Sequence, residues 1–419
     1  MGGEGYDRVV QGPADRVLAD RYTGESGDDG AGGGGTAVAA LDVDPPQLVF
    51  PIDSWLVPDN ALQRCLDDVR DTKKGNTTPY KALRFAVVDL TGDVTHPRYA
   101  AVGGEKQTSI DSMAKLGVFV AAYLLRDQVR IAAALLRDEK KEKVLKRINA
   151  AWKPYWETRI DGRPTDSPKI ERIFEINLGG PEHWQVRFKW EPKGENTMND
   201  LGHSADAGQV DFRNRLELMM RWSSNEAASA CMTDLGFQAI NSLLADAGFF
   251  DSQRGGLWLS KLYAKDGFWG RRDPAGGGTV HGGTARAVAE VLTLMAQDRL
   301  VRAGVAAEMR RIMSAGQGHG YGSWIVNAIQ AASDPRVPAG GTPANRRVDR
   351  YVAKVGLYGD RLSDCALIDR TTADGQALQY VMVVLNCPDD TTMNEISVLL
   401  DDCILAQHPP LPPQPAPNP

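Results

Sequence analysis

A serine and a lysine three positions apart, Ser112 and Lys115, have the types and spacing that suit covalent chemistry. They open a long apolar stretch, residues 109–127, which predicts a buried central helix with Ser112 one turn inside its start. Positions three apart share one face of a helix, so the lysine amine can reach the serine hydroxyl. A serine becomes a nucleophile when a base removes its proton, and burial beside another cation lowers the pKa of a lysine enough to make it that base. The pair therefore predicts acyl transfer through Ser112, although a chance S-x-x-K match is expected in a chain of this length.

A second motif, Ser223-Ser224-Asn225, lies at the predicted start of a helix. The ordinary interpretation is a serine that caps the helix N-terminus. The functional interpretation makes Ser223 a proton relay to the leaving group, with the Asn225 amide directed at Lys115 or at the substrate. The sequence around the motif leaves both interpretations open.

A third motif, Lys354-Val355-Gly356, lies on a segment of alternating polarity that predicts a strand. K-x-G is common, and the sequence contains two further matches, at 73–75 and 265–267. The first of these precedes Ser112 and the second falls in a glycine-rich loop. Only Lys354 lies on a strand that two more strands and a helix follow.

The elements that must position these residues follow from hydrophobic periodicity. Predicted helices are 59–74, 109–127, 211–222, 225–236, 237–248, 284–300 with Thr284 as N-cap, and 392–406, and predicted strands are 83–90, 98–103, 349–357, 364–370 and 377–386. This order predicts an α/β (α+β) fold: an antiparallel five-stranded sheet flanked by terminal helices, plus an inserted all-helical lobe.

In this order and context, the three motifs resemble the serine penicillin-recognising superfamily of class A β-lactamases and penicillin-binding proteins, whose signature is S-x-x-K, S-D-N and K-T-G. The resemblance covers most of residues 55–407, apart from an insertion at about 140–210. It implies that Ser112 is the nucleophile, Lys115 its general base and Ser223 the proton relay. Asn225 would then position lysine or substrate, and Lys354 would attract a substrate carboxylate and keep Lys115 neutral. The implied oxyanion hole and substrate strand comprise Ser112, Val355, Gly356 and Leu357.

Three departures bear on the substrate. Val355 replaces the threonine that donates a hydroxyl to the substrate carboxylate. No glutamate lies between Glu226 and Glu290, where class A β-lactamases hold the residue that activates the deacylating water; Asp251, Asp266 and Asp273 are available, but in a different local setting. No export signal is visible, whereas peptidoglycan lies outside the membrane.

We therefore expect a β-lactamase-like serine hydrolase of amides or esters that is not an efficient β-lactamase. The alternative is a non-catalytic or acyl-trapping binding protein that keeps the penicillin-binding fold.

Composition excludes several other classes of function. The formal net charge of -6 argues against nucleic acid, and no apolar run is long enough to span a membrane. The 6 histidines and 5 cysteines show no metal-binding spacing, so we expect no metal, no cofactor, and a small-molecule or peptide-like substrate. The odd cysteine count fits a reducing, cytoplasmic location, unless translation starts upstream of Met1 and the protein is exported. The resemblance places Cys65 and Cys403 on neighbouring terminal helices, so a bridge between them stays open. The sequence leaves the oligomeric state undetermined.

The chain divides into three parts. Residues 1–44 form a glycine-rich flexible segment, 45–407 the folded hydrolase domain, and 408–419 a proline-rich disordered tail. Residues 137–148 are expected to be charged and solvated. Four tryptophans of the insertion predict a small satellite core or, alternatively, a substrate surface or partner site: Trp152, Trp156, Trp184 and Trp190. The loop 255–283, with Trp258 and Trp269, is expected either to form a mobile wall of the pocket or to be a structural spacer.

Overall fold

The computed structural model describes residues 56–73, 82–136, 139–159, 167–178, 184–264, 281–302, 304–314, 322–337, 342 and 344–411. Its largest sheet has six strands, in the order β1-β3-β2-β13-β12-β11. These strands are β1 (Val57–Pro58), β2 (Arg84–Asp89), β3 (Arg98–Val102), β11 (Arg347–Tyr358), β12 (Arg361–Thr371) and β13 (Ala377–Cys387).

The five longer strands of this sheet pair antiparallel, which confirms the predicted fold class. The predicted strand count was one short, because two residues of β1 pair parallel with β3 at Val57 and Pro58. A two-residue strand is too short to produce a recognisable alternation in the sequence.

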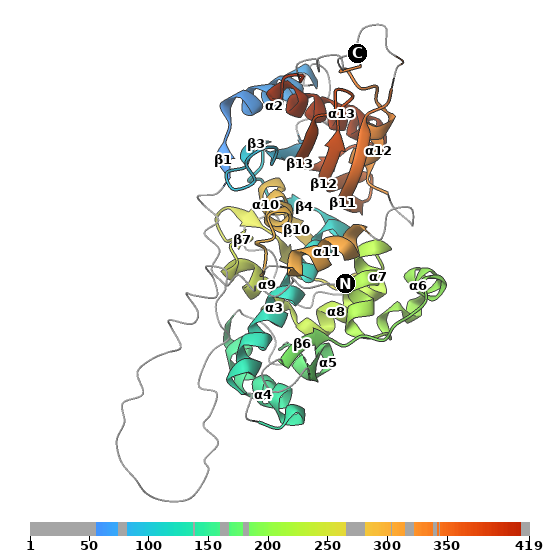
Figure 1. Ribbon diagram of the computed structural model, residues 1–419. Helices are drawn as coiled ribbons and strands as arrows, with labels where there is room; N and C mark the ends of the chain where they lie inside the picture. The colour runs from blue at the N-terminus through green and yellow to red at the C-terminus, as the bar shows by residue number, and fades with distance from the viewer. Residues whose placement is uncertain are drawn as a thin grey trace, which may run out of the picture.

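The sheet separates two hydrophobic cores. Along β13, Val381, Val383 and Leu385 belong to one core, while Met382 and Val384 belong to the other, because successive side chains of a strand point to opposite faces. The second core is covered by the helices α2 (Asn60–Lys73), α12 (Trp324–Ala331) and α13 (Asp390–Gln407), which lie together on one face of the sheet in Figure 1. The predicted terminal helices are therefore confirmed.

The first core continues into the helical lobe drawn in the lower half of Figure 1. Its elements are η3 (Asp111–Ala114), α3 (Lys115–Leu135), α4 (Lys141–Arg159), α5 (Ile170–Ile173), α6 (Glu195–Gly202), η4 (Ala205–Gly208), α7 (Phe212–Arg221), α8 (Asn225–Leu235) and α9 (Phe237–Asp246). Helix α10 (Ala285–Ala296) packs on the sheet itself, against β2, β12 and β13, and α11 (Val305–Ser314) contacts β11, α7 and α10. Helix α3 is buried nearly all round, as its composition predicts. The Thr284 side chain accepts a hydrogen bond from the N–H of Ala287, which confirms it as the N-cap of α10.

The insertion at about 140–210 contains a hairpin as well as helices. Its hairpin of β5 (Phe174–Leu178) and β6 (Trp184–Phe188) packs Phe188 between Phe174 and Phe212 in stacked geometry. Helix α4 is charged, but it is solvated on one side only. It buries Val144, Ile148, Trp152 and Trp156 at a spacing of four residues, so these two tryptophans build a core, whereas Trp190 is exposed.

The segment 255–283 contributes short strands where the structure describes it. These are β8 (Gly255–Gly256), which pairs with β7 (Phe250–Asp251), and β9 (Trp258–Leu259), which joins β4 (Thr108–Ser109) through β10 (His281–Gly283). Trp258 is buried against Phe250. The expectations for Trp269, Asp266 and Asp273, for residues 1–44 and for the end of the proline-rich tail lie outside the described residues.

Helices α2 and α13 are joined by a disulfide between Cys65 and Cys403, whose Cα atoms are 5.7 Å apart. The expectation of reduced cysteines is therefore wrong for this pair. The two helices pack side by side on the sheet, which brings residues from opposite ends of the chain within bridging distance. The other three cysteines, Cys231, Cys365 and Cys387, are buried thiols, as predicted.

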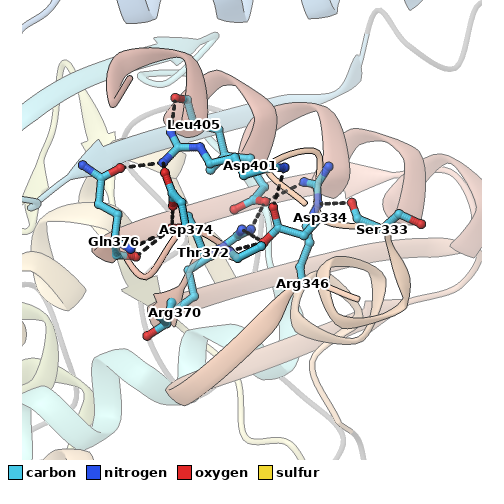
Figure 2. A network of polar contacts seen from close by, with 12 residues as sticks. Ser333, Asp334, Arg346, Arg370, Thr372, Asp374, Gln376, Asp401 and Leu405 are labelled. Carbon is cyan, nitrogen blue, oxygen red and sulfur yellow. Dashed lines mark hydrogen bonds and ion pairs between the residues drawn. The ribbon is translucent and has the colours of Figure 1, made fainter. Parts of the chain in front are cut away.

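A buried polar network fastens α13 to the end of the sheet (Figure 2). Arg370 and Arg346 both contact the Asp401 carboxylate, and Arg370 also contacts Asp334 at 3.2 Å. Each charge in this network has an opposite partner, which offsets the cost of removing it from water. Among the described residues, no helix is long and apolar enough to cross a membrane, and no cluster of potential metal ligands occurs.

Candidate active site

Ser112 lies in the 3₁₀ turn η3, and α3 starts only at Lys115. This corrects the prediction that Ser112 is already inside the α-helix. In a 3₁₀ turn, side chains three positions apart lie nearly in line, so the turn brings the two side chains still closer together. The Ser112 Oγ and the Lys115 Nζ are 3.0 Å apart.

The strand β11 packs directly against this turn, and Gly356 makes that possible. A Cβ atom at Gly356 would lie 2.2 Å from the carbonyl oxygen of Ile110 and 3.1 Å from the nitrogen of Met113. The glycine of the K-x-G motif is therefore a packing requirement. Because β11 is the last strand of the sheet, one of its edges is left without a strand partner and faces the turn.

Ser223 reaches the same place from the start of α8. The helix is capped by Ser224, whose Oγ accepts a hydrogen bond from the N–H of Ala227 at 3.3 Å. The ordinary interpretation, a serine cap, therefore holds for Ser224, while the Ser223 hydroxyl contacts Lys115 and Lys354 instead. The Ser223 backbone adopts a φ of 55°, which is unusual for a residue other than glycine and is a form of strain found at functional sites.

The ammonium of Lys115 is the centre of the site. Its Nζ lies 2.5 Å from the Ser223 carbonyl oxygen, 3.1 Å from the Ser223 Oγ and 2.7 Å from the Asn225 Oδ1. Together with Ser112, these are four oxygens around one amine, and the lysine is completely buried. The arrangement positions Lys115 between the two serines.

Lys354 approaches Ser223 from the opposite side. Its Nζ donates to the Ser223 Oγ at 2.9 Å and to the Val355 carbonyl oxygen at 3.2 Å. The hydroxyl of Ser223 therefore connects the two lysines. The structure thus brings Ser112, Lys115, Ser223, Asn225 and Lys354 into one continuous hydrogen-bonded group, with Ser223 as the bridge between the two lysines.

Burial lowers the pKa of both amines, and charge repulsion adds to the effect at Lys115. Burial lowers the pKa of Lys115 well below its ordinary value, and the nearby charge of Lys354 lowers it further. Burial lowers the pKa of Lys354 to about 8, against the opposing influence of Cys365 and Asp364. A pKa of about 8 favours a protonated Lys354 at neutral pH. Burial favours the neutral form of Lys115, which lies beside the Ser112 hydroxyl.

A small pocket opens beside Lys354. Ser223 and Val355 line it, together with Ser323, Tyr351 and Arg221. Val355 is nearly buried and offers no hydrogen-bond donor from its side chain, as the sequence indicates. Leu357, two residues further along β11, is exposed at the edge of the sheet. Asp251 lines a different pocket, with Glu105 and Glu290.

Sequence reasoning missed three residues of the site. The Tyr263 ring lies over the Lys115 ammonium, with 4.5 Å between the nitrogen and the ring centroid, and the His281 ring stacks on Tyr263. Asp111 precedes Ser112 with a φ of 41°, and burial raises the pKa of its carboxyl to about 7. The only available signal was position, because Tyr263 and His281 lie in the segment interpreted as a wall of the pocket.

Comparisons with known proteins identify the family of the chain. The model of the Beta-lactamase enzyme family matches residues 189–398, half of the chain, and the match includes Ser223, Asn225 and Lys354. A search of curated proteins finds no match. The chain belongs to the beta-lactamase enzyme family.

Solved structures with a similar arrangement include a beta-lactamase from Sphaerobacter thermophilus DSM 20745, at 15% identity and a TM-score of 0.43, covering 84% of this chain and 98% of that one. Another is PBP-A, at 11% identity and a TM-score of 0.43, covering 84% and 98%. A third is the class A beta-lactamase of the last common ancestor of Gram-negative bacteria, at 14% identity and a TM-score of 0.44, covering 83% and 100%.

Proposed function

We propose that this protein is a serine acyl-hydrolase that acts on an amide or ester through a covalent intermediate on Ser112. The observation that carries the proposal is the position of the Ser223 hydroxyl. It lies 3.1 Å from the amine of Lys115 and 2.9 Å from that of Lys354, beside a serine that Lys115 contacts at 3.0 Å. Two amines and two hydroxyls in hydrogen-bond contact form a complete path for a proton.

In the first half-reaction, neutral Lys115 takes the proton of the Ser112 hydroxyl while the Oγ forms a bond to the substrate carbonyl carbon. The carbonyl oxygen becomes an oxyanion. The bond to the leaving nitrogen or oxygen then breaks, and that atom takes a proton from Ser223, which regains one from Lys115. The products of this step are an ester on Ser112 and a released amine or alcohol. Lys354 stays protonated, so its charge favours transfer of the proton away from Lys115.

The oxyanion requires donors that are already in place. We assign this role to the backbone N–H groups of Ser112 and Leu357, on either side of the contact between η3 and β11. Gly356 supports this assignment, since the strand can lie against the turn only when residue 356 has no side chain.

The lining of the pocket indicates the substrate class. With Val355 in the pocket, a substrate carboxylate lacks the hydroxyl donor that a threonine would supply, so we propose a small-molecule or peptide-like ester or amide in preference to a D-Ala-D-Ala peptide. No cofactor takes part in these steps.

With no glutamate between Glu226 and Glu290, we expect slow release of the acyl group and inefficient β-lactamase activity.

The test is covalent labelling of the full chain with a fluorescent penicillin and with a fluorophosphonate probe. Intact mass should show one adduct on the wild-type protein and none on Ser112→Ala. Ser314→Ala is the matched control and should label like the wild type, because the Ser314 hydroxyl, within the described part of the chain, donates to carbonyl groups of its own helix. Equal labelling of wild type and Ser112→Ala would contradict the proposal. Rapid multiple turnover of penicillin would contradict the expected slow release of the acyl group.

The second candidate is a binding protein that traps an acyl group or binds without reacting. The aromatic cover of Lys115 by Tyr263 favours the acyl-trapping form. A permanent single adduct with no turnover of any ester would support acyl trapping. Failure of every probe to label Ser112 would support simple binding.

A further inference from the structure

Lys115 is enclosed on the side away from Ser112. Three of its oxygen contacts come from Ser223 and Asn225, and the Tyr263 ring covers the ammonium at 4.5 Å. The lysine has no solvent-exposed surface. A water molecule that needs Lys115 as its base must therefore take the place of one of these groups.

Tyr263 is fixed at both ends of its side chain. Its hydroxyl donates to the carbonyl oxygen of Asp111 at 2.8 Å, the residue before Ser112. Its ring stacks on His281, with centroids 4.0 Å apart and planes 6° from parallel. The His281 carbonyl in turn accepts a hydrogen bond from the Ile110 N–H at 2.9 Å. Tyr263 is therefore linked, directly through Asp111 and indirectly through His281, to the two residues that precede Ser112.

The segment that carries Tyr263 is itself attached to the helical lobe. The Asn241 side chain bonds both the N–H and the carbonyl of Leu259, at 3.0 and 2.7 Å. The N–H of Ala264 donates to the Ser229 Oγ at 2.8 Å. The ring is thus held over Lys115 by bonds on both sides of it along the chain.

Release of an acyl group from Ser112 requires a water oxygen to bond to the ester carbon while a base takes a proton from that water. The bond from this carbon to the Ser112 Oγ then breaks, and the Oγ regains a proton. Of the groups in hydrogen-bond contact with Ser112, Lys115 is the base, and Tyr263 covers it. Resting on the proposed function, we propose that Tyr263 is a positioning residue that holds the Ser112 turn through its hydroxyl and excludes water from Lys115 through its ring. It thereby prolongs the lifetime of the acyl-enzyme.

Two variants separate these two actions. Tyr263→Phe keeps the ring and loses one hydrogen bond, so labelling by a fluorescent penicillin should slow by about 2- to 10-fold while the lifetime of the label stays within about twofold of wild type. Tyr263→Ala removes the ring as well, so the label should be lost at least about tenfold faster, as expected when a general base gains access to water. Tyr263→Leu, which preserves apolar packing on His281, should give an intermediate lifetime and serves if the alanine variant does not fold.

The measurement is the time course of the intact mass, which gives both rates from one experiment. Tyr99→Phe, a tyrosine on β3, is the matched control and should change neither rate. Label lifetimes that are the same in Tyr263→Ala, Tyr263→Leu and wild type would overturn the role of Tyr263 but leave the proposed function standing. Absence of any label on the wild-type protein would overturn the proposed function and this inference with it.

Discussion

Lys354 and Lys115 share the Ser223 hydroxyl but have different protonation requirements. Lys115 must lose its proton to act as a base, and burial beside Lys354 depresses its pKa. Lys354 must keep its proton to supply positive charge, and its pKa is about 8. In the proposed mechanism, these two side chains therefore determine the rising and the falling limb of the pH profile.

We predict that the acylation rate rises with pH as Lys115 loses its proton and falls above pH about 8 as Lys354 loses its own. In Lys354→Met, the falling limb should disappear and the maximal rate should drop. Stopped-flow labelling with a fluorescent penicillin across the pH range measures both effects. A falling limb that persists in Lys354→Met would show that a different group titrates.

The second prediction at this scale concerns Val355. Val355→Thr changes little in shape and adds a hydroxyl to the wall of the pocket. A hydrogen bond to a charged group is worth about 1.5–3 kcal/mol, so acylation by carboxylate-bearing β-lactams should accelerate by about tenfold or more. A neutral ester probe without a carboxylate is the internal control. Equal acceleration of both probes would mean that the carboxylate does not bind at this position.

At the scale of elements, the contact between β11 and η3 aligns the candidate site. Gly356 lies where the strand touches the turn, and Lys354 lies two residues earlier on the same strand. The position of Lys354 relative to Ser112 therefore depends on how closely the strand approaches the turn.

Gly356→Ala should separate the strand from the turn, since its Cβ would lie 2.2 Å from the Ile110 carbonyl oxygen. We expect a loss of about 1–3 kcal/mol in the free energy of unfolding and about a 10²-fold slower labelling of Ser112. Urea denaturation and probe kinetics measure the two effects. Gly194→Ala is the control, because a Cβ there meets open space. Normal labelling of Gly356→Ala would show that the strand can shift without cost to the site.

The elements themselves were largely predictable. Helix α3 and strand β13 were predictable from long apolar runs, which the folded protein buries. The 3₁₀ start at Asp111–Ala114 was not predictable, because 3₁₀ and α turns place similar residues on the same face. The strand character of β1 and β10 was also missed, since strands of two or three residues owe their pairing to neighbours that are distant in sequence.

At the scale of the whole molecule, both ends of the described chain meet on one face of the sheet. The disulfide joins Cys65 and Cys403, which are separated by 338 positions in the sequence. The Asp401 network attaches α13, the helix that carries Cys403, to β12 (Figure 2). A cross-link over so long a separation removes much freedom from the unfolded chain.

We predict that the oxidised protein carries one disulfide and that its reduction lowers the free energy of unfolding by about 2–4 kcal/mol. Intact mass after alkylation, with and without reductant, detects the bridge, and urea unfolding measures the effect on stability. Cys65→Ser should behave like the reduced protein, while Cys231→Ala, which alters a buried thiol, should remain sensitive to reductant. Alkylation of Cys65 and Cys403 in the absence of reductant would contradict this prediction.

The sequence by itself determined the chemical groups and the elements that carry them: a serine and lysine three apart, a second serine before a helix, and a lysine with a glycine on a strand. These depend on local spacing, which is already present in the unfolded chain. The tertiary structure alone decided that Ser223 bridges two lysines, that Tyr263 covers one of them, and that Cys65 meets Cys403. Such contacts join residues far apart in sequence, and their geometry follows from the packing of whole helices on the sheet.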